Sequence, residues 1–315
     1  MKKILALVCV LCMLFALAAC GQSAEKTFTV GICQLVQHPA LDAATQGFKD
    51  ALSAKLGDKV SFVEQNASGD APTCAVICSQ FVGDEVDLIM ANATPALLAA
   101  QSATNKIPVL GTSVTDYASA LEIDDWSGAT GTNISGTSDR VPEEEQAKLF
   151  GELFADAKTV GILFCSAEPN SRVQADAITP ALESMGFTVK EFVFADSNDV
   201  AQVAATACDE SDVLYIPTDN TAASNSELIS SVALNAGTPI IAGEEGLCKG
   251  CGVATLSISY YDLGTVTGNM AYEILVNGKN PGEMEIEYAP FTKKYDADIC
   301  AALGITVPAD YVAID

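Results

Sequence analysis

Short apolar segments alternate with segments of helical periodicity along most of this chain, and this alternation constrains its fold more than any other feature. Nine segments rich in Val and Ile carry the strand pattern: 27–35, 59–67, 86–92, 107–114, 159–165, 187–195, 212–217, 239–243 and 252–259. Segments that are apolar on both faces are typical of parallel strands covered by helices on each side. The pattern therefore predicts a doubly wound α/β fold.

The strand pattern restarts after a stretch rich in Gly, Ser and Thr at 128–138. We interpret this stretch, together with 257–263 and 281–290, as hinge crossovers between two parallel-sheet lobes of similar topology. The expected first lobe comprises 27–134 and about 261–288, and the second comprises 135–260 and about 289–315. Open parallel sheets bind ligands outside the carboxyl ends of their strands, so we expect the functional residues in the loops at the strand ends.

The first twenty residues have the pattern of an export signal. Two lysines precede an apolar run of about sixteen residues, which is short for a membrane-spanning helix. The run ends in Leu-Ala-Ala-Cys, and small residues before a cysteine fit the lipobox of bacterial lipoproteins. We predict that the signal peptide 1–19 is removed, that Cys20 is lipidated, and that 20–26 tether the protein to the outer face of a cell membrane. An ordinary signal peptide with a chance cysteine is the alternative.

Charge and composition exclude several classes of function. The chain has 16 Lys and Arg against 41 Asp and Glu, a formal net charge of −25, which works against binding a nucleic-acid backbone. The single histidine, His38, disfavours catalytic triads, His-rich zinc sites and haem ligation. The sequence has no GxSxG elbow, no GxxxxGK[ST] loop and no convincing GxGxxG motif. We therefore expect no enzyme activity, no cofactor and no metal.

Eight cysteines follow the predicted lipidation site, and two of them form a CxxC motif, Cys248 and Cys251, in a Gly-rich segment. A thioredoxin-like motif would lie at a helix start after a first strand, so we expect a local disulfide or two thiols here. A four-cysteine zinc site with Cys74 and Cys78 would have to join distant segments. The sequence leaves the pairing of the eight cysteines open.

Polar residues follow the predicted strands where each strand ends. Hydroxyl groups and free backbone N–H groups at helix starts can bind a carboxylate, whereas acidic side chains can bind an ammonium group. A zwitterionic α-amino acid needs both, and amide side chains add donors and acceptors. Each of these residues alone could be a helix cap, so the prediction depends on their convergence. The candidate ligand-binding residues are Gln34, His38, Thr94, Asp116, Asn170, Ser171, Asp219, Asn220 and Glu244.

These loops resemble those of ABC-transporter substrate-binding proteins of the tryptophan/tyrosine-binding kind. The resemblance covers nearly the whole chain after the signal and is carried by 30–48, 66–70, 87–96, 112–116, 168–171, 215–220, 260–264 and 303–310. It implies a two-lobed type 1 periplasmic-binding-protein fold that closes on a small ligand. It also implies delivery of that ligand to a membrane permease and its ATPase.

The resemblance also implies roles for particular residues. Thr94, Asn170 and Ser171 would hold the carboxylate of an amino acid. Asp219, with Glu244, would hold its amino group.

Other positions would shape the cleft. Gln34 and His38 would border the pocket for the ligand's side chain, and Asp116 would brace the cleft. The chain departs from the family pattern at Tyr117, where Pro is expected, and at Asp296, where Asn is expected. The first departure alters the expected cleft wall and therefore bears on the identity of the ligand.

The sequence thus predicts an exported solute-binding lipoprotein of an ABC importer that binds an amino acid, in particular an aromatic one. Two alternatives stay open at this point. The same fold could serve as an extracytoplasmic sensory module for a signalling receptor, or it could bind an aromatic carboxylate that is not an amino acid.

Overall fold

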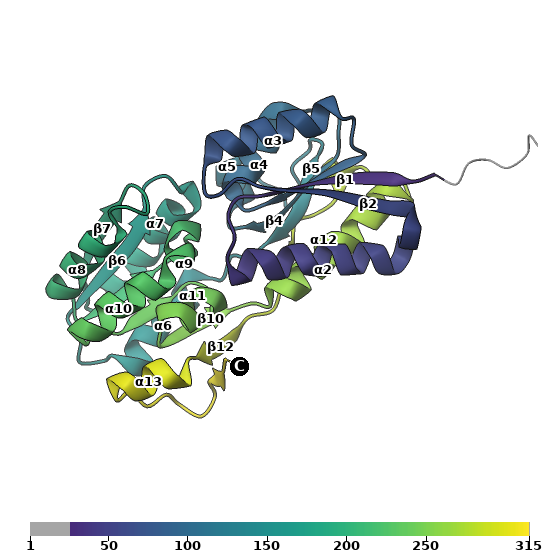
Figure 1. Cartoon of the computed structure of the whole chain (residues 1–315). Helices are drawn as coiled ribbons and strands as arrows, with labels where there is room; N and C mark the ends of the chain where they lie inside the picture. The colour runs from purple at the N-terminus through teal and green to yellow at the C-terminus, as the bar shows by residue number, and fades with distance from the viewer. Residues whose placement is uncertain (1–25, 315) are drawn as a thin grey trace, which may run out of the picture.

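The computed structural model describes residues 26–314, and its first lobe is built on a six-stranded parallel sheet in the order β11-β5-β4-β3-β1-β2 (Figure 1). Its strands are β1 (Phe28–Gln34), β2 (Val60–Asn66), β3 (Leu88–Asn92), β4 (Val109–Val114), β5 (Ile134–Ser138) and β11 (Glu287–Tyr288). Its helices are α2 (Pro39–Leu56), η2 (Gly57–Lys59), α3 (Ala71–Gly83), α4 (Thr94–Ala103), α5 (Tyr117–Ala120), α12 (Tyr260–Leu275) and η3 (Pro281–Glu283).

The second lobe repeats this plan in a seven-stranded sheet of order β13-β12-β10-β9-β8-β6-β7, in which β12 runs antiparallel to β10. Its strands are β6 (Thr159–Cys165), β7 (Thr188–Phe194), β8 (Val213–Ile216), β9 (Ile240–Ala242), β10 (Ala254–Ser257), β12 (Thr292–Tyr295) and β13 (Val312–Ala313). Its helices are α6 (Glu143–Leu153), α7 (Pro169–Ser184), α8 (Val200–Glu210), α9 (Asn220–Ser224), α10 (Ser226–Ala236), α11 (Glu245–Cys251) and α13 (Ala297–Leu303). The predicted fold of two doubly wound parallel-sheet lobes is therefore confirmed.

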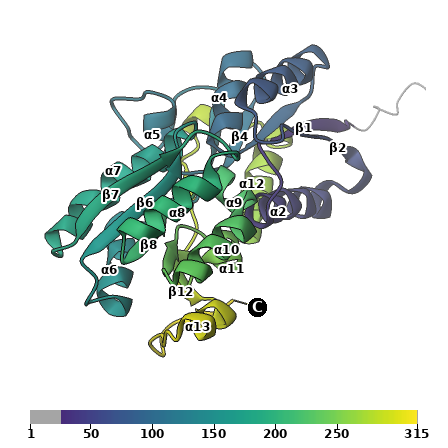
Figure 2. The ribbon, with the colours of Figure 1, turned by 60° about the vertical axis from the view of Figure 1, so that its left-hand side comes forward.

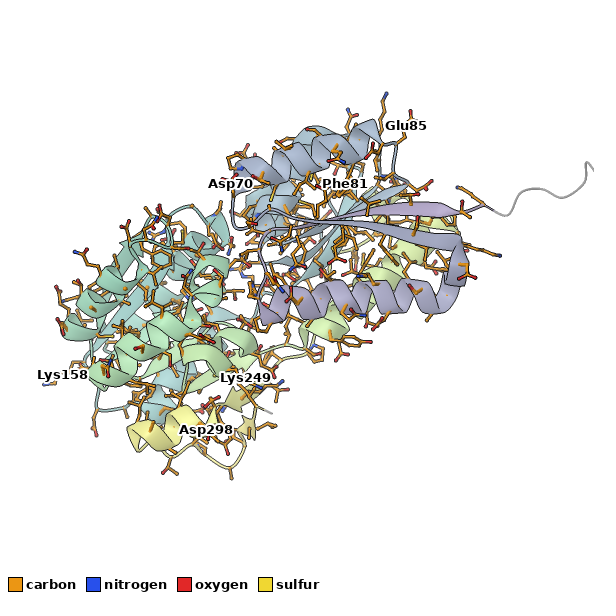
Figure 3. The ribbon with its side chains drawn as sticks, viewed as in Figure 1. Asp70, Phe81, Glu85, Lys158, Lys249 and Asp298 are labelled. Carbon is orange, nitrogen blue, oxygen red and sulfur yellow. The ribbon has the colours of Figure 1, made fainter. Side chains whose placement is uncertain are left out.

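Helices cover both faces of the first sheet, as the turned view also shows (Figure 2). Phe48 of α2 and Met270 of α12 pack on one face. Phe81 of α3, labelled in Figure 3, packs on the other. Helices α2 and α12 approach closely because Gly264 has no side chain: a Cβ there would lie 2.0 Å from the carbonyl oxygen of Ala44. Helix α12 follows the second lobe in sequence, so this packing returns the chain to the first lobe.

Within the described residues, the chain crosses between the lobes three times, near 139–142, 258–259 and 289–291. Strand β5 pairs with β4, so it belongs to the first lobe although the expected boundary fell after residue 134. Its Gly, Ser and Thr residues carry a weak strand signal, which explains the difference. We propose a first boundary after Ser138.

Asp139 joins two of these crossovers. This buried carboxylate accepts hydrogen bonds from Thr115 Oγ1 at 3.1 Å and from the Tyr260 hydroxyl at 2.8 Å. Burial raises the pKa of Asp139, an effect that the two hydrogen bonds oppose. The start of α12 is thereby fastened to the end of the first sheet, beside the crossovers between the lobes.

All eight cysteines of the described residues are free thiols and are buried. Cys248 and Cys251 lie on helix α11 as two separate thiols, which donate to the carbonyl oxygens of Gly252 and Leu247. Burial raises the pKa of both thiols, which disfavours the reactive thiolate form. Within residues 26–314, the structure contains no group of three or more metal-ligating side chains arranged to hold a metal ion.

The predicted signal peptide and Cys20 lie outside the described residues. Within residues 26–314, no helix combines the length and the apolar composition that crossing a membrane requires.

Candidate functional site

The strand-end loops of the two lobes face each other across a cavity of about 480 Å³. Loops that follow β1, β2 and β3 line it from the first lobe, and loops that follow β6, β7 and β8 line it from the second. Asp70, at the end of α3 that faces the second lobe, marks this edge in Figure 3. The volume falls within the range of small-molecule sites, and the place is the one expected for a ligand of parallel sheets.

Strained backbone marks the same edge of the first lobe. Ser68, Ala93 and Ser113 have φ values of 55°, 90° and 54°, and they lie at or just after the ends of β2, β3 and β4. None of them is glycine, so each adopts a left-handed or otherwise rare backbone conformation at a cost in free energy. Such strain is concentrated at functional sites, and here it shapes the loops that face the second lobe.

Three of the predicted site residues carry buried polar atoms that have no hydrogen-bond partner. These atoms are the Thr94 hydroxyl, Asn170 Oδ1 and His38 Nδ1, and each side chain is at least nine-tenths buried. Asn92 Oδ1 and the Ser113 hydroxyl, which sequence reasoning missed, share this property. An unpaired buried polar group costs about 1–3 kcal/mol, so these strand-end atoms are suited to receive a polar ligand.

Asp219 is buried at the end of β8 and is fully engaged within the second lobe. It accepts hydrogen bonds from the backbone N–H of Cys165 at 2.7 Å, from the Ser171 hydroxyl at 2.8 Å and from the N–H of Ala222 at 2.8 Å. Burial, followed by the charge of Glu168, raises the pKa of Asp219. Two neighbouring buried carboxylates favour a cation beside them, because a positive charge relieves their repulsion.

Glu168 is a site residue that sequence reasoning missed. Its Oε2 accepts from the Asn220 backbone N–H at 2.9 Å and from Asn220 Nδ2 at 2.6 Å, and its Oε1 accepts from the Thr221 N–H and hydroxyl at 2.7 Å each. Asn170 Nδ2 makes a longer contact of 3.4 Å. The sequence does show an acidic residue directly before Pro169, which is typical of the first position of a helix. Residues that cap a helix are common at this place.

Gln34 is buried but is used within its own lobe. It accepts from the Thr45 hydroxyl at 2.6 Å and donates to the Val36 carbonyl at 3.0 Å and to Asp42 Oδ1 at 2.7 Å. Its amide therefore holds the loop after β1 against α2.

Glu244 lies apart from the other acids. It caps α11 by accepting from the backbone N–H groups of Gly246 and Leu247, and it lines a different cavity with Pro39 and Tyr260. Burial raises the pKa of Glu244 to about 7, against the hydrogen bonds that lower it. The structure thus does not place Glu244 in the cavity that Glu168 lines.

Asp116 caps α5 through the Ser119 N–H at 2.9 Å and forms an ion pair with Arg140 near the first crossover. It also lines a smaller cavity of about 260 Å³ with Thr94 of its own lobe and Asn170 of the other. This position lies between the hinge and the facing loops.

The charged side chains that line the larger cavity are all acidic. Asp70, Glu168 and Asp196 line it, whereas no Lys or Arg of the described residues does. A ligand carboxylate would therefore have to be bound by hydroxyl and N–H groups, and a ligand ammonium would meet acidic side chains.

Comparisons with known proteins identify the family that this chain resembles. The sequence profile of a family described as ABC transporter substrate binding protein matches residues 29–309. A tyrosine-binding protein of Clostridioides difficile (strain R20291) is 37% identical over 265 residues, which cover 83% of this chain and 76% of that protein.

Two solved structures of comparable sequence identity superpose on this chain to different extents. An ABC domain of Streptococcus pneumoniae in complex with L-Trp is 30% identical, with a TM-score of 0.86 over 90% of this chain and 97% of that one. The ligand-free, open structure of a substrate-binding protein with adhesive properties from Clostridium difficile is 37% identical, with a TM-score of only 0.69 over 92% and 99%. As a whole, the present chain therefore superposes more closely on the complex than on the open protein.

Proposed function

Because this chain belongs to the family of ABC transporter substrate-binding proteins, we propose that it captures an aromatic amino acid between its lobes and delivers it to an importer. The names of the similar proteins, which concern tyrosine and L-Trp, support this ligand class. The observation that carries the proposal is the pair of cavities that both lobes line. Acidic side chains and no Lys or Arg of the described residues line the larger one, and Thr94 and Asn170, each with a buried unpaired polar atom, line the smaller one.

We assign the two ends of the amino acid as follows. Thr94 and the first turn of α7, with Asn170 and Ser171, hold the carboxylate. The acid pair of Glu168 and Asp219 attracts the ammonium group. The contribution of Ser171 is indirect, because its hydroxyl already donates to Asp219.

We propose in addition that the protein is exported and anchored through a lipid on Cys20. The apolar segment that precedes this cysteine, with two lysines before it, supports that proposal. The partners would be a permease and its ATPase on the membrane that carries the anchor.

The ligand class is tested by thermal unfolding with each of the twenty L-amino acids. We expect L-tyrosine or L-tryptophan at about 100 times its Kd to add about 2.7 kcal/mol of stability, which raises Tm by about 5 °C or more. The same measurement with tyramine and with 3-(4-hydroxyphenyl)propionate removes one charged end at a time, and both should shift Tm far less. Absence of a shift with every amino acid would contradict the proposal, and a full shift with the deaminated acid would favour an aromatic carboxylate.

The Thr94→Val substitution should change ligand affinity without lowering the stability of the ligand-free protein. We expect Thr94→Val to weaken amino-acid binding roughly 10- to 100-fold, because a hydrogen bond to a charged group is lost. The ligand-free protein should be as stable as before, or more stable by about 1 kcal/mol, because the hydroxyl is buried without a partner. Titration calorimetry and urea unfolding measure the two effects, and Thr94→Ser, which keeps the hydroxyl, is the control. Equal affinity of the valine variant would exclude Thr94 from the carboxylate site.

A further inference from the structure

His38 connects the two lobes directly. It immediately precedes α2 in the first lobe, and its Nε2 lies 3.2 Å from Oδ1 of Asn220, the first residue of α9 in the second lobe. The two views place the start of α2 against the second lobe, near α9 and α11 (Figures 1 and 2). The side chain is 6% exposed, so this contact is enclosed when the lobes are together.

The surrounding hydrogen bonds fix which nitrogen of the ring carries hydrogen. Asn220 Nδ2 donates to Glu168 Oε2 at 2.6 Å, so its Oδ1 faces His38 as an acceptor. Nε2 must therefore donate. The other nitrogen, Nδ1, is buried and has no partner, which suits the uncharged ring, in which Nδ1 carries no hydrogen.

A charged ring would be costly in this position. Protonation would bury a positive charge and leave an N–H group at Nδ1 unpaired. Burial lowers the pKa of His38, against the opposing effects of Asn220, Glu168 and Asp42. From α11, Glu244, Glu245 and Lys249 line the cavity next to Pro39. Lys294 of β12, which forms an ion pair with Glu245, lines it too, so both signs of charge lie near the start of α2 on that side.

We propose that His38 is a positioning residue that latches the closed cleft in its uncharged form, so that ligand capture is coupled to loss of a proton from this ring. The inference rests on the proposed function, since closure matters only if a ligand is captured. When the lobes separate, the ring meets water and regains an ordinary pKa of about 6.5. Closure therefore favours the uncharged ring, and its contribution to affinity is lost as the pH falls below about 6.5.

Calorimetry tests the latch through proton release. L-tyrosine and L-tryptophan are titrated into the protein, prepared without a polyhistidine tag, in buffers of different ionisation enthalpy at about pH 6.5. Wild type should release about half a proton more than His38→Gln, since half of the open rings are protonated there. Between about pH 7.5 and 5.5, wild type should lose about ten-fold more affinity than His38→Gln.

The glutamine variant is the matched control because its Nε2 can still donate to Asn220 but does not titrate. It also retains Asp219 and Glu244, so any protons that these acids gain or lose on binding are common to both proteins. His38→Ala, which removes the donor, should bind more weakly at every pH. Rescue by glutamine and not by alanine, at about pH 7.5, is the signature of a positioning role.

Nuclear magnetic resonance gives a second measurement, because the chain has a single histidine. The imidazole nitrogens of the ligand-saturated protein should show the hydrogen on Nε2 and a pKa below the ordinary value. An ordinary pKa in the saturated protein, or equal proton release by wild type and His38→Gln, would overturn the latch. Failure of both amino acids to bind at about pH 7.5 would instead contradict the proposed function.

Discussion

Replacing Asp219 by alanine should lower the free energy of unfolding of the ligand-free protein by about 2–4 kcal/mol and abolish amino-acid binding. The carboxylate caps α9 and accepts from the ends of β6 and α7, through Cys165 and Ser171. Alanine would leave three buried donors without an acceptor. The loops after β6 and β8 would then lose the connection that holds them together.

Asp219→Asn separates the cap from the charge. Asparagine can still cap α9, so we expect a smaller loss of stability than with alanine, together with a large loss of affinity for a ligand that carries an ammonium group. Urea unfolding and titration calorimetry with L-tyrosine measure the two losses. Asp209→Asn, on the exposed surface of α8, is the control. Wild-type affinity in both Asp219 variants would refute the role in binding.

The pH dependence of unfolding gives a further check on Asp219. Burial and the charge of Glu168 raise its pKa in the folded protein, so the folded state binds more protons than the unfolded state above about pH 4. The contribution of this group to stability therefore decreases as the pH rises from about 4 toward the folded pKa. This decrease should be absent from Asp219→Ala.

The fold could be predicted because the alternation of apolar strands with helices occurs in both halves of the sequence. Strands such as β6 are buried on both faces and read as continuous apolar runs, and the same order of strands occurs in both sheets. Strand β5 was harder to predict because its residues, from Ile134 to Ser138, are mostly small and polar. The family inferred from the loop motifs is confirmed by the profile match and by the curated relative.

The site was less predictable because a sequence gives the position of a polar residue but not the direction of its side chain. Gln34 and Glu244 stand at strand ends, yet Gln34 bonds within its own lobe and Glu244 caps α11. Glu168 is absent from the predicted site residues, although its carboxylate turns toward α9. The pairing of Glu168 with Asn220 and Thr221, more than 50 positions away, depends in addition on the register of the whole sheet.

Glu168→Gln should weaken amino-acid binding by about 100-fold or more, because it disrupts the hydrogen bonds that place Asn220 and Thr221. Both carboxylate oxygens are acceptors here, one for each of these residues. In glutamine an NH2 group replaces one of the two carboxylate oxygens. That NH2 group would point its hydrogens at the N–H and O–H groups that now donate to Glu168. Asn220 would then lose the anchor that turns its Oδ1 toward His38, and the bond between the lobes would be weakened with it.

Calorimetry with L-tyrosine and L-tryptophan measures the affinity, and Glu183→Gln, an exposed position on the same helix, is the control. A second readout comes from Asp219, whose raised pKa depends in part on the charge of Glu168. In Glu168→Gln the pH-dependent loss of stability should therefore end at a lower pH than in wild type. The effects of Glu168→Gln and Asp219→Asn on affinity should also be less than additive, because the two acids attract one ammonium group together. Strict additivity, or unchanged affinity in Glu168→Gln, would mean that the acid pair does not act as one site.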